Sequence, residues 1–125
     1  LTAQQGLIAN LDPLLGRAPS AGLLALSSSV AREPRAYWGA YAASKAAFET
    51  LVTSYGAEMR NISTLRSAIL DPGGTRTQMR ARAYPGEDPQ SIKDPDAVGE
   101  YVAKLMTEGF DSTAFHALPK VMADA

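Results

Sequence analysis

The sequence predicts an α/β fold in which parallel strands are joined by crossover helices. Short apolar runs alternate along the chain with longer segments that have apolar residues at helical spacing. This order of strand, long helix, strand and helix is typical of a parallel sheet. Residues 22–28 are apolar without alternating polar residues until the run reaches its serines, as expected of a strand that is covered on both faces.

The first half of the chain supplies a helix, a strand and a second, longer helix. Residues 2–17 carry apolar side chains at helical spacing, and Pro13 inside them should kink or split that helix. The buried strand over residues 22–28 follows a Pro-containing turn. The long helix is expected over residues 39–60, and the second strand over residues 64–70.

The second half begins with a stretch that has no clear period. Residues 73–93 combine Pro, Gly and many charges, so we expect an irregular and mobile segment. Asp94-Pro95 is a helix-start signature, and this helix should end near Gly109. Residues 113–118 are expected to form a last short strand.

Composition excludes several classes of function. The 125 residues are enough for one ordinary domain, and the net charge of −1 favours neither nucleic acid nor an anionic membrane as a partner. There is no cysteine, which removes disulfides and thiolate metal sites and is compatible with a cytoplasmic protein. No apolar run approaches the roughly 20 residues that span a bilayer. We therefore expect a cytoplasmic protein that acts on a small molecule, without a metal.

A hydroxyl cluster and a Tyr–Lys pair are the candidate chemical groups. Tyr41 and Lys45 are four residues apart near the start of the long helix, so they lie on one helix face. A cation beside a phenol favours the phenolate, which suits a Tyr that exchanges a proton with a substrate oxygen. Ser28 lies 13 residues before Tyr41 at the end of the first strand, where its hydroxyl can polarise the same oxygen.

These residues resemble the short-chain dehydrogenase/reductase family. Its pattern is a strand that ends in Ser, then Tyr-x-x-x-Lys, then a strand that ends in Pro-Gly with a Thr five residues after the Pro. Here the matching positions are Ser28, Tyr41 with Lys45, Pro72-Gly73 and Thr77. The three elements in this order make a specific signal, whereas Tyr-x-x-x-Lys alone is a weak one.

The resemblance implies a fold, a reaction and a set of roles. The fold would be a doubly wound, Rossmann-like parallel sheet, and the reaction would be hydride transfer between NAD or NADP and a carbonyl or alcohol. Tyr41 would be the general acid or base, Ser28 would orient the carbonyl, and Lys45 would tune Tyr41 and hold the nicotinamide ribose. The resemblance further implies cofactor contacts by the following residues: Tyr41, Lys45, Pro72, Gly73, Thr75 and Thr77.

The resemblance covers only the second half of the family's pattern. The Gly-rich loop Thr-Gly-x-x-x-Gly-x-Gly and the later Asn-Asn-Ala-Gly segment do not occur. We therefore expect residues 1–125 to be the C-terminal part of a single NAD(P)-binding domain that carries the Ser-Tyr-Lys group. The alternative is a non-catalytic fragment that retains only its oligomerisation helices. A sugar-nucleotide epimerase, which uses the same Tyr and Lys, is less favoured because this portion is too short for its substrate domain.

The helix over residues 39–60 has two unlike faces. One face carries Tyr41, Lys45 and large apolar residues, which should pack on the sheet. The opposite face carries small residues where a solvated face would normally carry charges, namely Ala43, Ala46, Ala47, Thr50, Ser54 and Ala57. Small side chains let another helix approach closely, and the resemblance implies a homodimer or homotetramer formed through this helix.

Several residues keep two interpretations at this stage. Ser28 is favoured over Ser29 as the catalytic serine by its spacing. Tyr37 and Trp38 could line a substrate pocket or pack a loop, and Asp71 stands where relatives commonly have Asn before Pro-Gly. Arg76, Arg80 and Arg82 could meet an anionic substrate, although a solvated loop accounts for them more simply, and His116 is expected to be structural.

Overall fold

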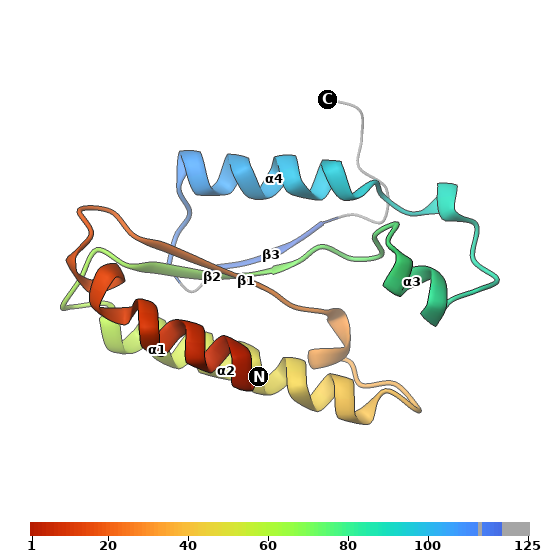
Figure 1. The fold of residues 1–125 in the computed structure, drawn as a ribbon, viewed down its shortest axis with the longest axis horizontal. Helices are drawn as coiled ribbons and strands as arrows, with labels where there is room; N and C mark the ends of the chain where they lie inside the picture. Colours follow the sequence, from red (N-terminus) through yellow and green to blue (C-terminus); the bar gives the residue numbers. More distant parts are fainter. Residues whose placement is uncertain (113, 119–125) are drawn as a thin grey trace.

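The chain folds into three layers around a small parallel sheet. The computed structural model describes residues 1–112 and 114–118. Within them, β1 (Gly22–Leu26), β2 (Arg66–Asp71) and β3 (Ala114–Ala117) are paired in parallel in the order β1-β2-β3. Helices α1 and α2 cover one face of the sheet and α4 covers the other (Figure 1). The predicted α/β class with a parallel sheet and crossover helices is confirmed.

The long helix and the helix expected after Asp94-Pro95 are confirmed near their expected bounds. α2 runs over Gly39–Met59 and α4 over Pro95–Glu108. The Asp94 carboxylate caps α4 by accepting a hydrogen bond from the Asp96 backbone N–H at 2.9 Å, which satisfies one of the free donors of the first turn. Gly109 ends the helix with φ of +88°, a conformation that few other residues adopt.

The first helix and the first strand differ from their predictions. α1 is one continuous helix over Thr2–Arg17, so Pro13 does not split it. β1 ends at Leu26, before the serines, and only Ala25 within it is buried. In the described sheet β1 is an edge strand with β2 as its neighbour, which explains why the expected burial on both faces is not reached.

The segment expected to be irregular contains two short helices. α3 spans Gln78–Ala83, and a 3-10 turn, η2, spans Pro89–Ser91. Another 3-10 turn, η1, follows β1 over Ser29–Ala31. The prediction of an irregular segment over residues 73–93 is therefore wrong in part: a six-residue helix is too short to show a hydrophobic period, and tertiary contacts hold it in place.

The core lies between α2 and the sheet. Leu70 of β2 and Val52 of α2 are 0% and 1% exposed. Gly56 lies so close to β2 that a Cβ atom there would overlap the Ser67 side chain, so only glycine permits this approach. α1 closes the layer through Ile8 and Leu15. In the described part of the chain, no helix has the length and apolar character needed to cross a membrane.

Candidate active site

The Tyr–Lys pair lies at the C-terminal end of β1. The first turns of α2 carry both side chains, each half-buried. The Lys45 ammonium donates a hydrogen bond to the Leu26 carbonyl at 3.5 Å and lies 5.8 Å from the centre of the Tyr41 ring. This contact attaches the helix to the strand end, which is where ligands bind in open α/β sheets.

The three serines after β1 have different surroundings. Ser27 is buried, and its hydroxyl has no hydrogen-bond partner among the described residues. The Ser29 hydroxyl accepts a hydrogen bond from Arg35 at 3.3 Å. Ser28 is half-buried, extended in backbone conformation, and makes no side-chain hydrogen bond within the part of the chain described. Of the three, Ser28 thus combines an accessible position with an unengaged hydroxyl.

Asp71 organises the turn after β2. One carboxylate oxygen accepts a hydrogen bond from the Gly73 backbone N–H at 2.9 Å, and the other accepts one from Arg32 at 3.2 Å. Gly73 itself has φ of +69°, in the left-handed region. Asp71 therefore holds the Pro72-Gly73 turn. Its negative charge, which an Asn at this position would not carry, is balanced by Arg32.

Side chains of the loop that follows β2 hold the rest of this turn. The Thr75 hydroxyl donates to the Gly73 carbonyl at 3.1 Å, and the Thr77 hydroxyl caps α3 by accepting a hydrogen bond from the Arg80 backbone N–H at 3.2 Å. Lys93, only 3% exposed, donates from its ammonium to the Gly74 carbonyl at 3.2 Å. These side chains thus hold the turn by bonding to its carbonyls, and Gly73 remains exposed.

Lys93 is an unusual support for such a turn. Its backbone pairs with Thr75 as a parallel bridge, and its carbonyl accepts a hydrogen bond from the Arg76 N–H at 2.9 Å. Burial lowers the pKa of the Lys93 ammonium, although the nearby Asp71 carboxylate opposes this shift. The loop over residues 75–93 is therefore closed at its base by backbone and side chain together.

An aromatic cluster borders Tyr41. The Trp38 ring meets the Tyr41 ring edge-on at 5.7 Å between centres and stacks on Tyr84 at 5.9 Å. The Arg80 guanidinium lies 3.8 Å from the centre of the Tyr84 ring. Tyr37 has φ of +70° and is fully exposed, so its backbone turns Trp38 into the cluster while its own side chain points to solvent. Of the two aromatic residues singled out, Trp38 is the one that packs.

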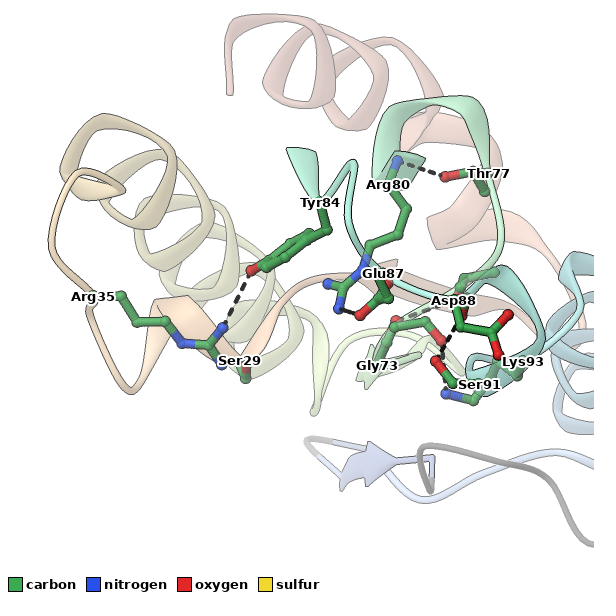
Figure 2. A network of polar contacts seen from close by, with 12 residues as sticks. Ser29, Arg35, Gly73, Thr77, Arg80, Tyr84, Glu87, Asp88, Ser91 and Lys93 are labelled. Carbon is green, nitrogen blue, oxygen red and sulfur yellow. Dashed lines mark hydrogen bonds and ion pairs between the residues drawn. The ribbon is translucent and has the colours of Figure 1, made fainter. Parts of the chain in front are cut away.

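Most arginines of this edge are paired with carboxylates. Arg76 pairs with Asp94 at 3.0 Å, and Arg80 makes two hydrogen bonds of 2.8 Å to Glu87 (Figure 2). These contacts lie within the loop or at its base; the Arg76 pair is still partly exposed to solvent, as expected of a solvated loop, whereas the Arg80 pair is more buried. Arg82, on the last turn of α3, is exposed.

The remaining sequence-predicted residue, His116, lies on β3, in register with Leu70 of the neighbouring β2. Its Nε2 atom is buried and has no hydrogen-bond partner among the described residues. The structure thus brings Ser28, Tyr41 and Lys45 to one sheet edge with the turn at Pro72-Gly73. It adds Arg32, Arg35, Tyr84 and Lys93, which the sequence did not single out.

Comparisons with known proteins agree with this architecture. A family model described as "short chain dehydrogenase" matches residues 4–88. Over 85 residues the chain is 49% identical to the uncharacterized oxidoreductase YciK of Escherichia coli (strain K12), which covers 68% of this chain and 33% of that protein. The chain is similar to only part of its relatives.

Two solved structures extend the similarity. A short chain dehydrogenase from Salmonella enterica serovar Typhi superposes with a TM-score of 0.86 at 39% identity, over 94% of this chain and 49% of that one. A Shigella flexneri 2a short chain dehydrogenase, described as complexed with NADP, gives a TM-score of 0.85 at 39% identity, with the same coverage. The chain thus spans about half the length of these structures. On the strength of the matched residues, this chain belongs to the short-chain dehydrogenase family.

Proposed function

We propose that the protein carrying this chain is an NAD(P)-dependent oxidoreductase that transfers hydride between nicotinamide and a carbonyl or alcohol substrate. One observation carries the proposal: the Lys45 hydrogen bond to Leu26 fixes the Tyr–Lys pair at the strand end that bears the serines. A proton donor, a cation and a free hydroxyl at one sheet edge are what a carbonyl reduction requires.

Each of the three side chains has a separate role in this proposal. Tyr41 exchanges a proton with the substrate oxygen, and Ser28 donates a hydrogen bond to the same oxygen. Lys45, beside the Tyr41 ring, holds the ribose of the cofactor. The half-buried position of Tyr41 and Lys45 suits these roles because both remain within reach of a ligand.

The turn after β2 suits a flat cofactor ring. Gly73 is exposed and has no side chain, and the bonds from the Thr75 hydroxyl to the Gly73 carbonyl and from the Lys93 ammonium to the Gly74 carbonyl hold the turn in shape. We assign cofactor contacts here to Pro72, Gly73, Thr75 and Thr77. When bound, NAD or NADP supplies or accepts the hydride. The NADP complex of the Shigella relative supports a nicotinamide cofactor.

We further propose that residues 1–125 form the C-terminal part of one nucleotide-binding domain, and that two or four copies associate through α2. The outward face of α2 forms an open groove of about 500 Å³ that includes Ala46, Thr50 and Ala57. Because these side chains are small, the α2 helix of a second copy can approach closely across a two-fold axis.

The test is the variant Tyr41→Phe in the full-length protein. It removes one hydroxyl and keeps the ring that packs on Trp38. We expect turnover of an aldehyde with NADPH or NADH to fall by about 10²-fold or more, the usual size of general acid–base catalysis.

The matched control is Tyr101→Phe on α4, on the other face of the sheet. This change should leave turnover as it is in the wild type. Turnover retained within a few-fold in Tyr41→Phe would remove Tyr41 from the mechanism and, with it, the proposed function.

A further inference from the structure

Arg35 differs from its neighbours in how its charge is balanced. Arg32, Arg76 and Arg80 are each paired with a carboxylate. Among the described residues, no carboxylate lies within ion-pair distance of Arg35, whose guanidinium donates only to two neutral hydroxyls. These are the Ser29 hydroxyl at 3.3 Å and the Tyr84 hydroxyl at 3.5 Å.

These two hydroxyls hold the guanidinium next to the candidate active site. Ser29 follows Ser28 directly, and Tyr84 belongs to the loop after β2 (Figure 2). The Arg35 side chain therefore bridges the serine segment and that loop. Because hydroxyls orient a guanidinium without neutralising it, its positive charge and remaining N–H donors stay available to an anion.

The same turn also places an apolar wall beside the charge. The Trp38 N–H donates to the Arg35 carbonyl at 3.1 Å, which closes a turn around the left-handed Tyr37. Trp38 then stacks on the Tyr84 ring and meets Tyr41 edge-on. The cluster thus has a fixed order: the Arg35 charge lies at one end, the Tyr84 and Trp38 rings lie in the middle, and the Tyr41 ring lies at the other end.

We propose that Arg35 binds an oxyanion on the substrate, a carboxylate or a phosphate, while Trp38 contacts the substrate's apolar body. This inference rests on the proposed function, since it assigns the reacting carbonyl of the same molecule to Tyr41. The substrate class is then a carbonyl compound that carries an anionic group at the end opposite its reacting carbon.

The test compares three aldehydes that share one ring: 4-formylbenzoate, 4-formylphenyl phosphate and methyl 4-formylbenzoate. In the full-length wild type we expect kcat/KM to be about tenfold higher for at least one anionic aldehyde than for the neutral ester, the effect of one charge-assisted contact. The higher of the two anionic values tells whether carboxylate or phosphate is the preferred group. In Arg35→Gln this ratio should fall to about one, and Arg35→Lys should restore part of it.

The matched control is Arg82→Gln, which removes an exposed arginine of the neighbouring α3 and should keep the wild-type ratio. If the wild type reduces the ester but shows no preference for either anion, or if Arg35→Gln keeps the preference, the inference is overturned while the proposed function stands. If no aldehyde is reduced, the proposed function fails. Calorimetry with 4-formylbenzoate and 4-formylphenyl phosphate then decides the inference: about tenfold weaker binding of the preferred anion by Arg35→Gln supports it, and equal binding overturns it.

Discussion

The two halves of α2 differ in burial and in what they contact. In the N-terminal half, Tyr41 and Lys45 are half-buried and meet a strand end and an aromatic ring. In the C-terminal half, Val52, Tyr55 and Met59 are 1%, 9% and 7% exposed. The buried half anchors the helix to the sheet, which lets the other half present its groups in a fixed position without being buried itself. Changes in the first half should therefore cost activity, and changes in the second should cost stability.

The largest loss of stability is expected when one methyl group is added in the buried half of α2. In Gly56→Ala the new Cβ would overlap the Ser67 side chain, so helix and strand must move apart. We expect the free energy of unfolding to fall by about 2–3 kcal/mol, the range of overpacked cores. Chemical denaturation of the full-length protein measures this loss.

The control for this variant is Gly99→Ala on α4, where nothing lies within 4 Å of the added Cβ. Because alanine favours a helix over glycine, this change should stabilise the protein by about 0.5–1 kcal/mol. Adding Ser67→Ala to Gly56→Ala should recover part of the loss. A neutral Gly56→Ala variant would show that close packing does not anchor this half.

A smaller effect is expected from Tyr55→Phe, which repeats the Tyr41→Phe change in the buried half. The Tyr55 hydroxyl donates to the Asp12 carboxylate of α1 at 2.6 Å. Its loss should lower the free energy of unfolding by about 1–2 kcal/mol, with turnover nearly unchanged. The same chemical change at the two ends of one helix would then separate activity from stability.

The pH dependence of this contribution follows from the same phenol. Burial, together with the hydrogen bond to Asp12, raises the pKa of Tyr55 from 10.0 to about 12. A raised pKa means that the stabilisation is fully present below pH 10 and is lost as the pH rises towards 12. The stability difference between wild type and Tyr55→Phe should therefore shrink between pH 10 and pH 12. A constant difference over that range would mean that folding does not raise the pKa of Tyr55.

The smallest effect on folding is expected on the outward face of α2. Thr50→Arg places a long charged side chain in the open groove, so the monomer's free energy of unfolding should change by no more than about 0.5 kcal/mol. Between two packed copies, however, the same charge would be buried without a partner. Sedimentation should show a smaller assembly for Thr50→Arg and an unchanged one for Thr107→Arg on α4. An unchanged mass for a folded Thr50→Arg variant would sink the proposed interface.

Much of the fold could be predicted because its elements are long or bounded by strong signals. α2 is long enough for its apolar positions to repeat several times, and α4 begins at Pro95 after its cap Asp94 and is followed by Gly109. α3 has six residues, too few for a hydrophobic period, and the three residues before it are polar or charged. The cap at Thr77 was its one available signal.

The candidate site was predictable only in part, for a related reason. Ser28, Tyr41 and Lys45 are close in sequence, so their spacing carries information. The Arg35–Tyr84 contact joins residues 49 positions apart, so no local sequence pattern predicts it. Lys93 was equally hidden, because a lysine among charged neighbours is normally exposed, whereas here it is 3% exposed beneath a turn.

The backbone pairing of Thr75 with Lys93 has a consequence for how the segment between them tolerates changes in length. Because both ends of the intervening segment are held side by side, the entropy of closing a longer segment grows only with the logarithm of the number of residues. The length of this segment is therefore less constrained than the positions of its two ends. Insertions and deletions within it would leave the Gly73 turn, which lies outside it, in place.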